Sequence, residues 1–219
     1  TVESAQGFAQ GLPVAVSPLT LSPRYNPNAT GEAAELAPGE LPPEVDVRQM
    51  SLLGAAWTLG SLKYLSESGA SRITCYETTG WRGVMETEAG SPLPEVFRSI
   101  PGSVFPLYHL LADVGEFAGG QVLPCRSSAS LTVDGLVLSK GDRVRVMVAN
   151  MGPTETTVRI EYGSLGRSVR VKRRDASNAE HAMVDPEGYR EDRGELRQVE
   201  GDRVEVELPP YSIIRVDRE

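Results

Sequence analysis

The hydrophobic pattern of this 219-residue chain changes its period near residue 120, and this change limits the possible folds more than any other feature. Before it, apolar residues gather in long segments with helical spacing, notably over 47–68. After it, short runs alternate apolar and polar residues, which is typical of strands in an antiparallel sandwich. The sequence therefore predicts an α/β part over residues 1–119 and an all-β part, an antiparallel β-sandwich, over residues 120–219.

The predicted strands of the second part are separated by short turn sequences. These turns are Asp-Gly, Lys-Gly-Asp, Met-Gly-Pro and Gly-Asp. A charged segment over 175–194 interrupts the pattern and has room for one helical turn. The predicted strands are 131–133, 136–138, 144–149, 157–160, 168–171 and 204–208, with a terminal strand near 208–215.

In the first part, the most regular element is the predicted helix over 47–68. Asp46 can cap its start and Gly69 its end. We expect its buried face to include the residues at helical spacing, namely Met50, Leu53, Trp57 and Tyr64.

Other segments of the first part surround this helix. A second helix is predicted over 104–117, with Pro106 in its first turn, and the end of another over 1–10. Strands are predicted over 12–21, with Pro13 first and Pro18 at the end, and over 73–76; residues 22–43 form a long loop. The order helix, strand, polar loop, helix is that of one unit of an α/β barrel, in which the carboxyl ends of the strands carry the active site.

The loop after the second strand holds the best candidate for catalysis, Glu77. A carboxylate at the end of a barrel strand can act as general base, acid or nucleophile. The alternative is a structural ion pair with Arg82 in the same loop, or with Arg24 beyond the preceding strand.

Other residues near this loop can bind a substrate, and each also has a structural alternative. Trp81 can stack on a sugar ring or cover the barrel rim. Arg82 and Arg24 can bind a carboxylate or lactone oxygen, or orient Glu77. Thr78 and Thr79 can donate to substrate hydroxyls or bond to the backbone of the turn.

Charge and hydropathy exclude several partners. The chain has 30 acidic and 22 basic residues, a net charge of −8, and residues 1–119 alone carry −7. Nucleic acids and anionic membranes bind clustered positive charge, so we expect neither as a partner. No apolar run approaches the roughly 20 residues that span a bilayer. No basic-then-apolar leader is present, so we expect a cytoplasmic location.

We expect no metal and no cofactor. His109 lies in an apolar helix, where a core or helix-surface histidine is more common than a metal ligand, and His181 lies in the charged segment. Cys75 is expected to be a buried thiol, with a disulfide to Cys125 as the alternative.

Three segments, 49–65, 76–83 and 100–109, resemble the C-terminal part of the D-apionate lactonase family. Val-Ala-Asn at 148–150 and Leu-Pro-Pro-Tyr-Ser at 208–212 are similar to the C-terminal sandwiches of clan A glycoside hydrolases, to which that family looks related. The resemblance implies the last βα units of a (β/α)8 barrel followed by a β-sandwich. Residues 12–21 and 72–77 would be the last two barrel strands, and the first six would lie upstream.

The resemblance implies a carbohydrate-active hydrolase acting on a small sugar-derived substrate. A retaining clan A glycosidase carries its nucleophilic glutamate at the end of the seventh strand, but the corresponding segment, 14–24, has no carboxylate. We therefore expect a sugar lactone such as D-apionolactone as substrate, with Glu77 as base for water and Arg24 or Arg82 for the oxyanion. A glycoside hydrolase and a non-catalytic carbohydrate- or partner-binding module are the alternatives.

Two expectations follow from an incomplete barrel. The 219 residues alone are expected to be inactive, because most of the site would be missing. Two barrel strands would leave sheet edges unpaired, so self-association is expected, and light scattering tests it.

Overall fold

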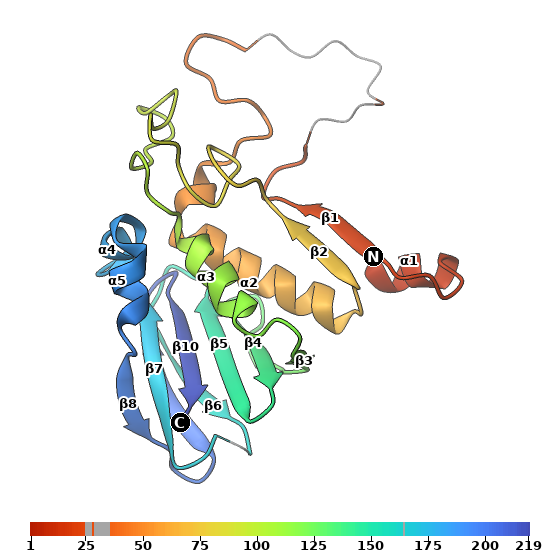
Figure 1. Ribbon diagram of the computed structural model, residues 1–219, viewed down its shortest axis with the longest axis vertical. Helices are drawn as coiled ribbons and strands as arrows, with labels where there is room; N and C mark the ends of the chain where they lie inside the picture. Colours follow the sequence, from red (N-terminus) through yellow and green to blue (C-terminus); the bar gives the residue numbers. More distant parts are fainter. Residues whose placement is uncertain (25–27, 29–35, 164) are drawn as a thin grey trace.

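The computed structural model describes residues 1–24, 28, 36–163 and 165–219. Within these residues the strands form a parallel pair, a six-stranded antiparallel sheet and an antiparallel pair. Helices lie between the parallel pair and the six-stranded sheet (Figure 1). The combination of α/β and antiparallel β architecture agrees with the fold class predicted from the sequence.

The parallel pair consists of β1 (Ala15–Leu19) and β2 (Arg72–Cys75). Their register matches Ala15 with Arg72 and Val16 with Ile73, so both strands end at the same edge of the sheet. Within the described residues neither strand has a second neighbour. The predicted self-association through these edges stays a prediction.

β1 is shorter than predicted. Pro13 lies before the strand, and Pro18 lies inside it rather than at its end. Proline cannot donate to a ladder, and the register with β2 shifts between Val16 and Leu19, around this proline.

The helices of the first part are α1 (Val2–Phe8), α2 (Leu52–Glu67) and α3 (Pro106–Gly115), together with the 3-10 turn η1 (Val47–Met50). Pro106 occupies the first turn of α3, as predicted. The prediction of one continuous helix over 47–68 is wrong, because Ser51 takes an extended conformation between η1 and α2.

Two caps and a glycine explain this break. Asp46 accepts from the backbone N–H of Arg48 at the start of η1, and Ser51 accepts from that of Gly54 at the start of α2. A Cβ on Gly54 would lie 2.3 Å from the carbonyl oxygen of Arg48. Glycine is therefore required where α2 starts against the preceding turn.

The predicted buried face of α2 is only partly correct. Trp57 and Tyr64 are 37% and 49% exposed, whereas the small residues Ala55 and Ala56 and the side chain of Leu59 are fully buried. The helix contacts both α3 and the six-stranded sheet. Ala55, Ala56 and Leu59 belong to the hydrophobic cluster that these elements share.

The six-stranded sheet has the strand order β3-β4-β5-β10-β7-β8, and β6 pairs with β9 on its other side (Figure 1). The short strands β3 and β8 were not predicted. The bounds are β3 (Gln121–Leu123), β4 (Val133–Lys140), β5 (Arg143–Asn150), β6 (Thr156–Glu161), β7 (Ser168–Arg174), β8 (Glu195–Gln198), β9 (Arg203–Leu208) and β10 (Ile213–Arg218). The charged segment holds two short helices, α4 (Ala179–Val184) and α5 (Pro186–Glu191).

The predicted Asp-Gly turn at 134–135 is wrong, because both residues lie inside β4. The Asp134 side chain is buried, accepts from the hydroxyl of Tyr64 at 2.6 Å and lies 3.9 Å from the ammonium of Lys63. These contacts with α2 compensate its charge. The dipeptide Asp-Gly occurs in surface turns and, as here, in a strand whose aspartate is buried and paired. The local sequence therefore does not distinguish the two cases.

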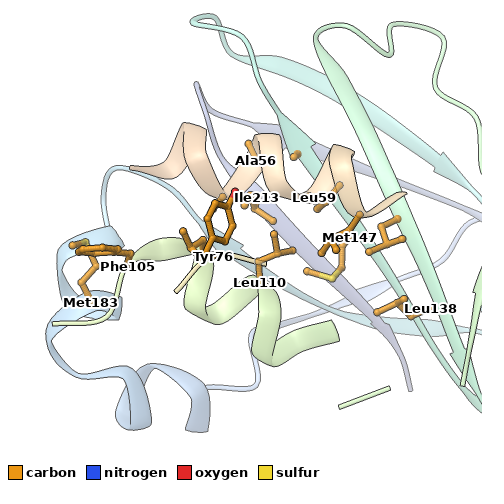
Figure 2. Packing of buried hydrophobic residues seen from close by; sticks show 14 of the residues in the cluster. Ala56, Leu59, Tyr76, Phe105, Leu110, Leu138, Met147, Met183 and Ile213 are labelled. Carbon is orange, nitrogen blue, oxygen red and sulfur yellow. The ribbon is translucent and has the colours of Figure 1, made fainter. Parts of the chain in front are cut away.

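One of two hydrophobic clusters joins the first part to the sheet. Tyr76 at the end of β2 and Leu110 of α3 belong to the same cluster as Leu138, Met147 and Ile213 of the sheet (Figure 2). The second cluster fills the interior of the sandwich. The helices α2 and α3 are thus fixed against the sheet.

His109 is fully buried, which is one of the two structural positions expected for it. Its Nε2–H donates to the carbonyl oxygen of Ala182 at 2.8 Å. Cys75 and Cys125 are both free and half-buried, so the disulfide alternative is wrong; burial raises the pKa of each thiol.

None of the helices in the described part of the chain is long and apolar enough to cross a membrane.

Candidate active site

The candidate site lies where β1 and β2 end. Tyr76 directly follows β2, has a positive φ of 54°, and is buried with its hydroxyl 2.6 Å from that of Thr58 on α2. This contact fixes the chain at the strand end. The next residue, Glu77, has a side chain that is 36% exposed and therefore open to solvent.

Glu77 is held by two guanidinium groups, as the sequence suggested. Its Oε1 lies 2.8 Å from Arg24 Nη1 and 3.2 Å from Arg82 Nη2. Among the described residues, no hydrogen bond is donated to Oε2. Within the described residues, the carboxylate is thus held through one of its two oxygens.

The loop after Glu77 is supported by its own backbone. The N–H of Glu77 donates to the carbonyl of Arg82, and that of Val84 to the carbonyl of Thr78. A Cβ on Gly83 would lie 2.6 Å from the backbone of Thr79, so this close approach requires glycine. The loop is a closed turn that fixes the spacing of Glu77 and Arg82.

Trp81 is packed against its surroundings. Its Nε1–H donates to Ser91 Oγ at 3.0 Å, and its ring centroid lies 6.4 Å from that of Phe97. These contacts suit a covering role. Its role in stacking on a sugar ring stays a prediction.

The hydroxyls of Thr78 and Thr79 are exposed and form no side-chain hydrogen bond within the described residues. They are therefore free to donate to a substrate, which also stays a prediction.

Two supporting residues were not found from the sequence. Glu44 lies 3.4 Å from Arg82 Nη1, and the buried Gln49 donates to the carbonyl of Gly83 at 2.7 Å. Both lie more than 30 positions from their partners, and no local pattern connects such distant positions.

The described residues contain no group of three or more histidine, cysteine, aspartate or glutamate side chains that could hold a metal ion.

The fold is similar to that of solved glycoside hydrolases. A GH30 endoxylanase from Clostridium papyrosolvens superposes with a TM-score of 0.56 at 12% identity, over 80% of this chain and 39% of its own. A GH51 arabinofuranosidase from Xanthomonas axonopodis pv. citri gives 0.55 at 15% identity, over 84% and 38%. A conserved exported protein from Bacteroides fragilis gives 0.57 at 12% identity, over 99% and 41%. These identities show the fold alone, and the chain spans about two fifths of each of these structures.

Two family matches identify the chain more narrowly. Residues 1–119 match the TIM barrel domain of D-apionate lactonase, and residues 130–216 match the C-terminal immunoglobulin-like domain of the same enzyme. The chain belongs to the D-apionate lactonase family. No curated protein matches its sequence.

Proposed function

We propose that this chain contributes to the active site of an enzyme that hydrolyses a sugar lactone of the D-apionolactone type. One observation supports this most. At the shared edge of two parallel strands, Glu77 has one oxygen paired with Arg24 and Arg82, and its other oxygen accepts no hydrogen bond from the described residues.

Lactone hydrolysis needs a base and a cation. Glu77 Oε2 accepts a proton from water while the water oxygen attacks the lactone carbonyl. The carbonyl oxygen becomes negative, and the guanidinium of Arg24 or Arg82 stabilises it. The ring C–O bond then breaks, and the ring oxygen takes the proton held by Glu77, which gives a hydroxy acid and restores the carboxylate.

The second candidate is a glycoside hydrolase, which the solved structures with this fold favour. Its mechanism uses two carboxylates on opposite sides of the scissile bond. Residues 14–24, which contain β1 and its exit, have no carboxylate, and Glu77 is the one carboxylate directly after the two strands. This arrangement favours the lactone.

The chain spans about two fifths of the solved structures that it resembles, so the activity is proposed for a polypeptide that supplies the remaining barrel strands. We expect the 219 residues alone to be inactive. The substrate is a small neutral sugar derivative, and no cofactor has a role in this chemistry.

The experiment compares two substrates with the complete polypeptide that carries this chain. Opening of D-apionolactone is measured with a pH indicator as the release of acid. It is expected to occur well above the spontaneous rate. Release of nitrophenol from aryl glycosides is expected to stay at background. Turnover of the glycosides with no effect on the lactone would contradict the proposal and favour a glycosidase. Polysaccharide binding without turnover of either substrate would favour a non-catalytic module.

A further inference from the structure

Tyr76, which directly precedes Glu77, has a backbone conformation that is rare for its residue type. Its φ is 54°, in the left-handed region, where a bulky side chain crowds its own backbone. Such a conformation costs free energy and persists only where the surrounding structure fixes it. Residues of this kind cluster at functional sites. The contacts of Tyr76 must therefore compensate the cost of its backbone conformation.

Tyr76 is the point where the chain leaves the sheet. Its N–H donates to the carbonyl of Leu19, the last residue of β1, at 3.1 Å. The N–H of the next residue, Glu77, donates instead to the carbonyl of Arg82 at 2.9 Å, across the loop. The direction of the Glu77 side chain thus depends on the turn that the backbone makes at Tyr76.

The side chain of Tyr76 is held by α2 and by the hydrophobic cluster that joins α2 and α3 to the six-stranded sheet (Figure 2). Its hydroxyl lies 2.6 Å from Thr58 Oγ1. Thr58 uses its one hydroxyl proton to donate to the carbonyl of Gly54 at 2.7 Å, so Tyr76 is the donor of the pair. Thr58 is fully buried and Tyr76 is 6% exposed, so water does not compete for this bond.

We infer that Tyr76 is a positioning residue for Glu77, and that its hydrogen bond to Thr58 keeps the carboxylate beside Arg24 and Arg82. The inference rests on the proposed function. Without this bond the backbone at residue 76 relaxes out of the left-handed region, and the Glu77 carboxylate leaves its place between the two guanidinium groups. A misplacement of about 1 Å in the reacting groups can lower a rate by about 100-fold.

The first test compares kcat and KM for D-apionolactone in variants of the complete polypeptide. Tyr76→Phe removes one oxygen and leaves no buried donor without an acceptor, because Thr58 still donates to Gly54. We expect this variant to fold, with kcat lowered roughly 10-fold and KM unchanged. Thr58→Val, which removes the acceptor, is expected to lower kcat as well. Thr58→Ser, which keeps it, is expected to retain kcat.

Tyr64→Phe is the matched control. The hydroxyl of Tyr64 also donates at 2.6 Å to a buried acceptor, Asp134, but this bond joins α2 to β4 and does not involve the end of β2. Its kcat is expected to stay unchanged. An equal fall in kcat for Tyr64→Phe and Tyr76→Phe would overturn the inference, because it would indicate a general effect of destabilisation.

A crystal structure of the Tyr76→Phe variant gives a second test, which needs no substrate. We expect a negative φ at residue 76 and the loss of the contacts of 2.8 and 3.2 Å that Glu77 Oε1 makes with Arg24 and Arg82. A variant that keeps both contacts, or a folded variant with undiminished kcat, would overturn the inference. If the unaltered polypeptide does not open the lactone, the proposed function fails, and the crystal structure still decides whether Tyr76 positions Glu77.

Discussion

At the scale of single residues, the same functional group, a carboxylate, has different roles according to burial. Glu77 is part-exposed, paired through one oxygen, and suited to chemistry. Asp113 is buried among four arginines, which, against the effect of burial, hold the pKa of its carboxyl below the usual value. Four surrounding cations make Asp113 a structural anion. The burial and the partners of each carboxylate distinguish a catalytic role from a structural one.

His109 gives a prediction at this scale. Burial, together with the charge of Arg174, lowers the pKa of its imidazole to about 4, below the ordinary 6.5. Because the pKa is lower in the folded state, the neutral imidazole contributes its full stability above pH 6.5. This contribution is lost as the pH falls from 6.5 towards 4. The loss is at most about 3 kcal/mol.

Urea unfolding at pH 7, 5.5 and 4.5 tests this. His109→Gln keeps a donor for the carbonyl of Ala182, and its free energy of unfolding is expected to fall less over this range than that of the unaltered protein. His181→Gln is the matched control, because that histidine is exposed, and its pH dependence is expected to be unchanged. Parallel curves for His109→Gln and the unaltered protein would show that His109 does not titrate with folding.

At the scale of elements, α2 shows how two glycines in one helix differ. A Cβ on Gly54 would meet the carbonyl of Arg48 at 2.3 Å, whereas a Cβ on Gly60 would have Met151 Sδ at 3.9 Å as its nearest neighbour. Gly54→Ala is expected to destabilise the protein by about 1–3 kcal/mol. Gly60→Ala is expected to be neutral or to stabilise by up to about 1 kcal/mol, because alanine favours the helix. Denaturant unfolding of the two variants measures this difference, and equal effects would contradict it.

The elements also show what can be predicted from the sequence. The positions of α2, β2 and α3 were largely correct, because periodicity and end signals are local. The start of α2 was wrong, because the close contact of Gly54 with Arg48 is a matter of three-dimensional geometry. β3 (Gln-Val-Leu) and β8 (Glu-Leu-Arg-Gln) were missed because neither short segment alternates apolar and polar residues.

In the candidate site too, local contacts could be predicted from the sequence and distant ones could not. Glu77 and Arg82 lie in one loop, and their pairing, together with that of Arg24, was among the alternatives read from the sequence. The support from Glu44 and Gln49 comes from distant positions and could not be predicted locally.

At the scale of the whole molecule, two kinds of contact join the α/β part to the sheet. A hydrophobic cluster connects α2, α3 and Tyr76 to β4, β5 and β10, and the charges around Asp113 connect α3 and α5 to β5, β7 and β10. Tyr76 directly precedes Glu77 in the chain. The sheet therefore supports the end of β2 that carries the candidate catalytic carboxylate.

A single comparison of rate constants tests the catalytic role of Glu77. The constant is kcat for D-apionolactone with the complete polypeptide, compared between the unaltered protein, Glu77→Gln and Glu44→Gln, with the Tm of each variant recorded to show that it folds. Glu44 also pairs with Arg82 but does not follow a strand of the parallel pair, so it is the matched control. Loss of a general base is expected to lower kcat by about 100-fold or more in Glu77→Gln, with little change in Glu44→Gln. A folded Glu77→Gln variant with undiminished kcat would show that Glu77 is a structural partner of Arg24 and Arg82 and takes no part in the reaction.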